Sequence, residues 1–264
     1  VHGAMFTRGP QDLMHTAIFV GGSNVSAGEA VFERVKKTLF PPFSVSVMMD
    51  SNGSNTTAAA TVLCAMKHLN LAETSALVLA GTGPVGFRVA QLLLGQGARV
   101  SLASRSLQRS QEACQRLSAS FPNAKLTPCE STSAAGMQSA TEGVQLVVAA
   151  GAAGVSLITA EQLKAISTLR VAIDLNAVSP AGIEGVAVMD KAKDRDGIIT
   201  YGAIGVGGTK MKIHHAAVRS LFESNDRRYD TKAIFELGQH RLGLFEHLSE
   251  FIAGDRRMPA GNLV

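Results

Sequence analysis

The chain has 264 residues, of which 46% are hydrophobic and 17% charged, and its formal net charge is +4. This length and composition allow a large buried core, while a mild charge without a basic run argues against a nucleic-acid-binding protein. No apolar run of 18 residues is present, so we expect no membrane span. The three cysteines are far apart and lack C-x-x-C spacing, which indicates neither a disulfide framework nor a zinc site and favours a cytoplasmic protein.

The first 70 residues predict a small α/β lobe. A strand is expected at 16–20 and a second at 44–49. Between them, Ser26 with Glu29 three residues later forms a capping-box pattern at the start of a helix.

The second strand is followed by a polar segment, residues 50–57, in which seven of eight side chains are polar. An alanine-rich helix begins directly after it. Capping that helix would use one or two of the side chains, so we expect the others to contact a substrate. Thr57 lies on the first helical turn, as does Asn55. The other candidate substrate-binding residues are Asp50, Asn52 and Ser54.

Gly81, Gly83 and Gly86 form a G-x-G-x-x-G motif between a predicted strand and a predicted helix. In that context the glycines allow a tight turn, a close approach of the backbone to a pyrophosphate, and close packing of helix on strand. The phosphates would bind the free N–H groups at the helix N-terminus. A βαβ unit with a glycine turn and no nucleotide is the alternative interpretation. The candidate dinucleotide-binding residues are Gly81, Thr82, Gly83, Pro84, Val85 and Gly86.

A strand over 99–103 follows, and its end discriminates between the two dinucleotides. NAD enzymes usually place Asp or Glu there to bind the ribose 2′-hydroxyl. Here the strand ends in Ser104-Arg105, with Arg109 one helical turn further on. A hydroxyl and a guanidinium bind a 2′-phosphate, whereas a carboxylate would repel it. The sequence therefore favours NADP, with NAD as the alternative cofactor.

Three more strands, separated by helical stretches, are expected at 125–127, 145–149 and 170–175. This alternation predicts a Rossmann-type, doubly wound parallel sheet, whose ligands bind beyond the carboxyl ends of the strands. Ala150 and Gly151 follow one such strand and Asn176 follows another, so all three are further candidates for cofactor binding. A tight turn and helix capping are the competing interpretations.

A glycine-rich segment, 202–208, precedes a helix that we expect to begin at Lys210. Lys210 and His214 are four residues apart and therefore share one face of that helix. A glycine loop admits close approach of a ligand, so both side chains are candidate cleft residues. A solvated charge is the ordinary alternative for a lysine near a helix start.

These elements predict two α/β lobes around a cleft. Residues 1–71 would form a substrate lobe, 72–208 a dinucleotide-binding domain, and 209–264 a set of C-terminal helices that return to the first lobe. No Ser-His-Asp arrangement, metal-ligand cluster or Walker loop is evident in the sequence. The available chemistry is hydride transfer by the cofactor, with protein groups orienting the substrate.

Three motifs together resemble the NAD(P)-dependent methylenetetrahydromethanopterin dehydrogenases of bacterial one-carbon metabolism. They are residues 50–60, the glycine motif within 78–86, and the run from Gly202 to His214. The first and third are specific to the family, whereas the glycine motif alone is not. The resemblance extends to about Leu237 and leaves the tail beyond it unexplained. Family members begin with a further segment that supplies an aromatic residue to the pterin site, and we expect such a segment to precede Val1.

The resemblance implies hydride transfer from the methylene bridge of a reduced pterin carrier, tetrahydromethanopterin or tetrahydrofolate, to NADP or NAD. It also implies two lobes like those of methylenetetrahydrofolate dehydrogenases, a homotrimer with a site shared between subunits, and catalytic roles for Thr57, Lys210 and His214. Positive charge builds up on the substrate as hydride leaves. We therefore expect Lys210 to orient the pterin through hydrogen bonds, or to sit beside a carboxylate.

Two other functions remain as alternatives. A dehydrogenase of another substrate on the same plan, such as a shikimate-type enzyme, would need a lysine–aspartate acid/base pair, and no convincing pair is evident. A non-catalytic NADP-sensing protein would keep the glycine motif without needing the polar segment or the Lys210–His214 face.

Overall fold

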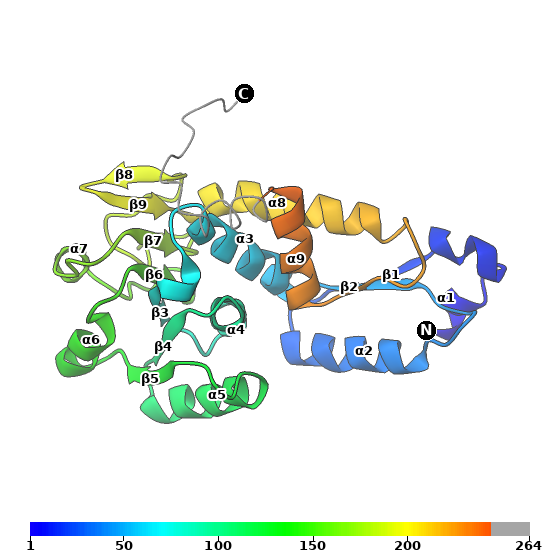
Figure 1. The fold of residues 1–264 in the computed structure, drawn as a ribbon, viewed down its shortest axis with the longest axis horizontal. Coiled ribbons are helices and arrows are strands. Elements are labelled where there is room, and N and C mark those ends of the chain that lie inside the picture. The colour runs from blue at the N-terminus through cyan, green and yellow to red at the C-terminus, as the bar shows by residue number, and fades with distance from the viewer. Residues whose placement is uncertain (244–264) are drawn as a thin grey trace.

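The computed structural model describes residues 1–243, which form two α/β lobes joined by shared helices (Figure 1). The smaller lobe starts the chain. A 3₁₀ turn, Ser51–Gly53, leads from it into the long helix α3 (Ser54–Met66). The elements of the smaller lobe before that turn are α1 (His2–Met5), a 3₁₀ helix (Pro10–His15), β1 (Ala17–Val20), α2 (Val25–Thr38) and β2 (Ser46–Met49).

The larger lobe is a seven-stranded sheet with the order β5-β4-β3-β6-β7-β9-β8, in which all neighbours are parallel except β8 and β9. The strand order reverses between β3 and β6, which is the doubly wound arrangement, so the predicted fold class is confirmed. A 3₁₀ turn (Leu71–Glu73) precedes this sheet. Its elements are β3 (Ser75–Leu79), α4 (Pro84–Gly95), β4 (Arg99–Ser104), α5 (Leu107–Ser120), β5 (Leu126–Glu130), α6 (Ala134–Thr141), β6 (Leu146–Ala149), α7 (Ala160–Lys164), β7 (Val171–Asp174), β8 (Lys193–Arg195) and β9 (Ile198–Tyr201).

The central strands of this sheet, β3, β6 and β7, are buried on both faces because helices cover each side. Along β3, Ala76 and Val78 point into a core shared with α3, α4 and α8, whereas Leu77 and Leu79 point into a second core shared with α6 and α7. This explains why the central strands read as continuous apolar runs rather than as alternating patterns.

The chain returns to the smaller lobe after the large sheet. Helix α8 (Ala203–Ser220) leads to β10 (Arg228–Tyr229), which pairs in parallel with β2, so the small sheet has the order β1-β2-β10. Helix α9 (Thr231–Arg241) then packs on α3 and α8. Within β2, Val47 and Met49 face α2, while Met48 faces the core of the larger lobe.

Helix α3 lies at the centre of the molecule, in contact with α4, α8 and α9 (Figure 1). Eleven of its 13 residues are buried, so it has no solvent-facing stripe. An alanine-rich sequence suits this position because small side chains let three helices approach it at once. Helix α4, which follows the glycine motif, and helix α8 are therefore both held against the element that begins in the polar segment.

Two sequence expectations about helix starts are wrong. Helix α2 begins at Val25, and its cap is Asn24, whose side chain accepts a hydrogen bond from the Ala27 N–H; Ser26 lies inside the helix. Helix α8 begins at Ala203 rather than at Lys210, with Gly202 as its N-cap, so residues 203–208 are helical and do not form a loop. Gly202 and Gly205 serve close packing instead: a Cβ added there would overlap the backbone oxygens of Ala187 and Asp190 respectively.

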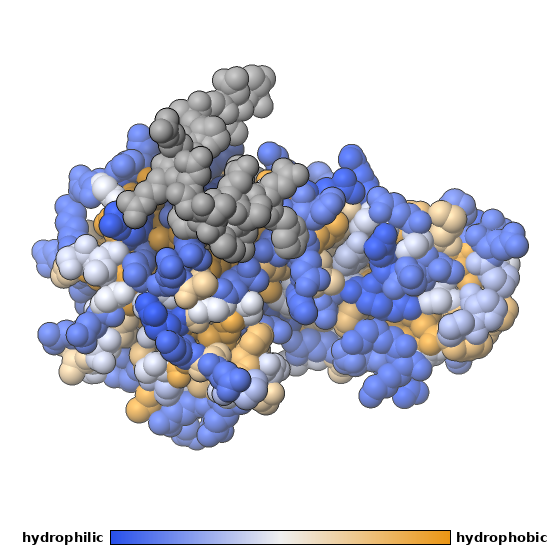
Figure 2. Space-filling view, viewed as in Figure 1, coloured by the Kyte–Doolittle hydropathy of each residue, from blue (hydrophilic) through white to orange (hydrophobic). Residues whose placement is uncertain are grey.

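Within residues 1–243, no helix is both long enough and apolar enough to cross a bilayer. Figure 2 shows hydrophilic side chains over much of both lobes in this view, with smaller apolar areas between them.

Two glycines of α8 give opposite predictions for stability. Gly205→Ala should lower the free energy of unfolding by about 1–3 kcal/mol, because the new methyl group collides with backbone that cannot rotate away. Gly207→Ala should raise it by about 0.5–1 kcal/mol, because Gly207 has open space around it and alanine is the better helix former. Urea unfolding of both variants checks this, and equal effects of the same sign would contradict the packing account.

Candidate functional site

The polar segment turns sharply at the end of β2 and starts α3. The buried carboxylate of Asp50 accepts hydrogen bonds from the backbone N–H groups of Asn55 (2.9 Å) and Thr56 (3.1 Å) and from the Thr56 hydroxyl (2.7 Å). Asp50 thereby satisfies N–H groups that the first turn of α3 would leave without partners. The turn also places Gly53 in the left-handed region, with φ of 59°.

Helix α8 brings Lys210 and His214 to this turn. The Nδ1 atom of His214 lies 3.7 Å from Oδ2 of Asp50. A Cβ added at Gly53 would lie only 2.5 Å from Nζ of Lys210, so the lysine crosses directly over that glycine. Thr57 donates a hydrogen bond of 2.6 Å to the carbonyl oxygen of the same glycine. Four sequence-predicted residues, one just after β2, one on α3 and two on α8, therefore meet around Gly53.

Lys210 forms no ion pair within residues 1–243, and the neighbouring carboxylate of Asp50 lies against His214 instead. Of the two arrangements expected for Lys210, orientation of a ligand through its ammonium hydrogens fits this geometry better. Glycine at position 53 leaves room for the Lys210 ammonium group itself, which a side chain there would displace.

The other predicted substrate residues divide into exposed and buried side chains. Asn52 is exposed, and its backbone N–H donates to the Gly22 carbonyl at 2.7 Å, which ties the turn to the end of β1. Ser54 and Asn55 are buried: the hydroxyl donates to the Ser51 carbonyl at 2.8 Å and the amide to the Met49 carbonyl at 2.6 Å. Their burial favours a role in shaping the segment over direct contact with a substrate.

Two residues that the sequence did not single out lie at this site. Phe19 of β1 is half-exposed and meets the His214 ring edge-on, with 6.1 Å between ring centroids. Arg88 of α4 is buried and binds the side chain of Asn55. A lone charge among the apolar residues of 84–95 was the available signal for Arg88, whereas nothing in the apolar run around Phe19 marks it.

The glycine motif forms the turn between β3 and α4. A Cβ at Gly81 would overlap the side chain of Leu102, and one at Gly86 would lie 2.8 Å from the Ala80 carbonyl oxygen, so both glycines allow close packing. Gly83 is the N-cap of α4, and no side chain caps this helix. The first N–H groups of α4, from Val85 onward, are thus left for an anion.

Residues from the neighbouring strand ends surround this turn. Ser104 at the end of β4 is buried, and its hydroxyl lies 3.5 Å from that of Thr82, while Arg105 next to it is exposed. On the other side, Ala150 follows β6, and a Cβ at Gly83 would lie 3.9 Å from its carbonyl oxygen. These residues lie where the strand order reverses, which is where doubly wound sheets bind dinucleotides.

Two of the remaining candidates make bonds or contacts inside the protein. A Cβ at Gly151 would lie 2.8 Å from the side chain of Leu157, which indicates packing. The Asn176 side chain is buried, donates to the Pro180 carbonyl at 2.8 Å and accepts from the Val178 N–H at 2.9 Å. These bonds hold the loop after β7, and because the next helix begins only at Ala203, Asn176 caps no helix. Burial raises the pKa of the nearby Asp174 carboxyl, although backbone N–H groups that bind it offset part of the effect.

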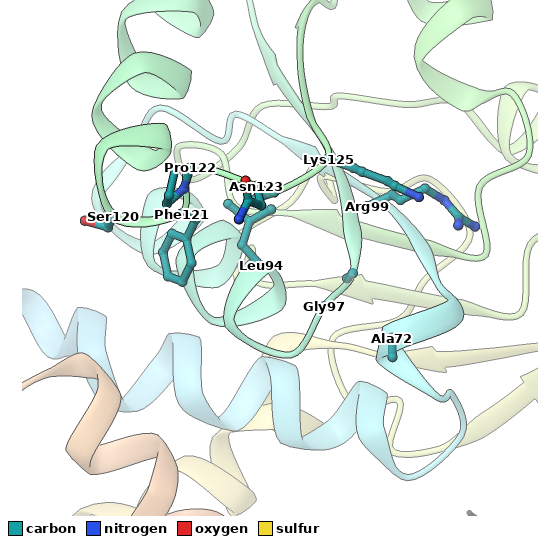
Figure 3. Close-up of a pocket in the computed structure, with 11 residues that line it drawn as sticks. Ala72, Leu94, Gly97, Arg99, Ser120, Phe121, Pro122, Asn123 and Lys125 are labelled. Atoms are coloured by element: carbon teal, nitrogen blue, oxygen red, sulfur yellow. The ribbon is translucent and has the colours of Figure 1, made fainter.

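A surface hollow lies at the opposite edge of the large sheet (Figure 3). Its lining includes Gly97 and Arg99 at the start of β4 and Phe121 and Lys125 just before β5. Since it adjoins the amino ends of the strands, it is remote from the glycine motif and plays no part in the candidate site.

Comparison with known proteins finds one matching family and two similar proteins. Residues 1–52 match the family described as methylene-tetrahydromethanopterin dehydrogenase, N-terminal. The bifunctional protein MdtA of Methylorubrum extorquens is 43% identical over 90% of this chain and 83% of its own. The chain belongs to the methylenetetrahydromethanopterin dehydrogenase family. A second relative, the NAD(P)-dependent methylenetetrahydromethanopterin dehydrogenase of the same organism, is 30% identical over 84% of this chain and 78% of its own.

Solved structures give more distant likenesses. Quinate dehydrogenase from Corynebacterium glutamicum in complex with NAD is 12% identical, with a TM-score of 0.46 over 84% of this chain and 97% of its own.

The position of Lys210 over Gly53 gives a prediction with a matched control. Gly53→Ala and Gly143→Ala both place alanine at a positive φ and should each cost about 1–2 kcal/mol of stability. Only Gly53→Ala should move Lys210, because a Cβ at Gly143 meets nothing within 4 Å. NMR of ¹³C-methylated lysines, with the Lys210 signal assigned from Lys210→Arg, checks this. An unshifted Lys210 signal in Gly53→Ala would refute the contact.

Proposed function

We propose that this protein transfers hydride from the methylene bridge of methylenetetrahydromethanopterin to NADP, giving the methenyl form. Family membership supports the reaction class, because both relatives named above belong to that family and one is named for this activity. The observation that carries the proposal is the meeting of Asp50, Thr57, Lys210 and His214 around Gly53. Segments more than 150 residues apart in the chain supply one polar site beside the central helix.

The residues at the start of α4 fit a dinucleotide. An uncapped helix N-terminus behind a glycine turn offers N–H groups and a favourable dipole to the pyrophosphate. Arg105 and the hydroxyls of Ser104 and Thr82 would receive a ribose 2′-phosphate, and we prefer NADP over NAD on that ground. When bound, the nicotinamide ring supplies the carbon that accepts the hydride.

The protein groups at the polar site then bind and orient the pterin. Loss of hydride leaves a cation spread over two nitrogens, so no strong base is required. Lys210 donates hydrogen bonds to pterin acceptors. The Thr57 hydroxyl, whose proton is directed to Gly53, presents its oxygen as an acceptor, and Asp50 holds His214 in place.

The organisation of the chain around this reaction is also proposed. We infer a pterin-binding lobe at 1–71, a dinucleotide-binding domain at 72–208 and a C-terminal part from 209 that returns to the first lobe, with substrate bound between the lobes. The pairing of β10 with β2 supports the return, while residues 244–264 of the third part lie outside the described residues. We further propose that the protein is a cytoplasmic homo-oligomer, and the family resemblance implies a trimer. Light scattering of the purified protein tests the assembly.

Tetrahydromethanopterin treated with formaldehyde supplies the substrate for the direct test. The purified protein should reduce NADP on its addition. Tight NADP binding without turnover would instead favour a sensor, and turnover with a hydroxy acid would favour a shikimate-type enzyme. Neither alternative is favoured by the relatives.

Lys210→Ala should lower kcat by about 100-fold while leaving the NADP dissociation constant unchanged, because the lysine positions the pterin and not the nucleotide. Steady-state kinetics and calorimetric titration with NADP give the two values. Equal losses of turnover and NADP affinity would assign the lysine to the cofactor instead.

Arg105→Ala should weaken NADP binding by about tenfold and leave NAD binding unchanged, because a charge-assisted hydrogen bond to the 2′-phosphate is lost. Arg99→Ala is the matched control, since Arg99 lies at the other end of the same strand. Equal weakening for both nucleotides would show that Arg105 does not distinguish the 2′-phosphate of NADP from the 2′-hydroxyl of NAD.

A further inference from the structure

Arg88 joins the nucleotide-binding helix to the substrate segment through a buried hydrogen-bond network. We propose that Arg88 is a positioning residue, which transmits dinucleotide binding at the start of α4 to the polar segment 50–57. The proposal rests on the proposed function for the identity of the nucleotide. In this role Arg88 keeps the bound dinucleotide and the polar segment 50–57 in a fixed relative position.

Three different helices bind the guanidinium. Its Nε donates to Oδ1 of Asn55 on α3 at 2.5 Å, and Nη1 donates to the Pro84 carbonyl in the first turn of α4 at 3.0 Å. Its Nη2 forms an ion pair of 2.6 Å with Glu29 on α2 of the smaller lobe. The Arg88 side chain is 6% exposed, and among residues 1–243 its charge is compensated by that one carboxylate.

Asn55 is the second member of the network. Its Oδ1 also accepts a hydrogen bond of 2.9 Å from the Thr231 hydroxyl at the start of α9. Its Nδ2 donates to Met49, the last residue of β2, and its backbone N–H donates to Asp50. These bonds fix the Asn55 side chain, so neither the polar segment nor the Arg88 guanidinium can move far relative to it.

The contacts are continuous from the dinucleotide site at the start of α4 to the polar site around Gly53. The carbonyl of Pro84 belongs to the turn that receives the pyrophosphate, and Arg88 binds it. Arg88 binds Asn55, Asn55 binds Asp50, and Asp50 lies against His214. A shift of α4, caused by phosphate binding at its N-terminus, would therefore displace the polar segment through the side chains of Arg88 and Asn55.

Stability alone is a weak reason for such an arrangement. A buried ion pair contributes little compared with apolar side chains of the same volume, because desolvation offsets most of the attraction. The planar fork of arginine instead fixes direction, since each of its nitrogens has a defined partner. Hydride transfer needs the reacting carbons about 3–3.5 Å apart, and a misplacement of about 1 Å costs about 100-fold in rate.

Hydrogen exchange of the full chain with and without NADP tests this coupling without the pterin. In the natural protein, NADP should slow amide exchange both at residues 85–87 and at residues 55–57. In Arg88→Met, slowing should persist at 85–87 and vanish at 55–57. Arg116→Met is the control, because Arg116 stacks on Phe87 outside the network and should leave both responses intact.

Arg88→Lys and Glu29→Gln keep the test decisive if Arg88→Met fails to fold. The lysine ammonium group has a single nitrogen and cannot reach partners that three separate guanidinium nitrogens bind, so Arg88→Lys should also lose the response at 55–57. Glu29 is 47% exposed, and Glu29→Gln should fold and reduce the response only in part. Slowing at 55–57 that survives in Arg88→Lys, or its absence in the natural protein with NADP bound, overturns the proposal.

Kinetics provide the second readout once turnover is established. Arg88→Lys should lower kcat by up to about 100-fold, with little change in the NADP dissociation constant, and should raise the deuterium isotope effect for a dideuterated methylene bridge. A merely structural role would reduce the folded fraction and leave the isotope effect unchanged. Failure of the proposed function would appear as no turnover in the natural protein, with the exchange result unaffected.

Discussion

The carboxylate of Asp50 is the interaction on which the candidate site depends. It directly follows the buried strand β2, satisfies N–H groups at the start of α3 and lies against His214 of α8. One side chain thereby connects the small sheet, the central helix and the helix that carries Lys210. Replacing this side chain with alanine would leave buried donors without an acceptor, which is more costly than the loss of a single average hydrogen bond.

The central helix turns this local arrangement into a relation between lobes. Because α3 is buried among α4, α8 and α9, the segment at its start cannot shift independently of the helix that faces the dinucleotide. The Arg88–Asn55 contact adds a directional link where apolar packing supplies only proximity. Apolar packing thus sets the distance between α4 and the polar segment, and hydrogen bonds set their relative orientation.

The sequence revealed those features that depend on local backbone demands. The glycine motif, the strand that precedes it and the polar end of β4 could be read directly, because a tight turn and an uncapped helix start require particular residues in order. The polar segment at 50–57 was found for the same reason. Its division into exposed Asn52 and buried Asn55 could not be foreseen, because that burial comes from helices far along the chain.

Features that depend on tertiary packing were missed or misread. Residues 202–208 looked like a loop because glycine disfavours helices, but contact with the backbone near Asp190 overrides that preference. Strand β10 has two residues and no periodicity to detect, and it exists because β2 offers a free edge. The approach of His214 to Asp50 spans 164 positions of sequence, which no local pattern records.

The central claim is that the polar site around Gly53 and the start of α4 hold one substrate pair. The most direct measurement is a crystal structure with NADP and the reduced pterin bound together. The account predicts the nicotinamide carbon about 3–3.5 Å from the bridging carbon of the pterin, with Lys210 and Thr57 in contact with the pterin. A pterin bound away from Gly53, or a dinucleotide away from the uncapped end of α4, would contradict it.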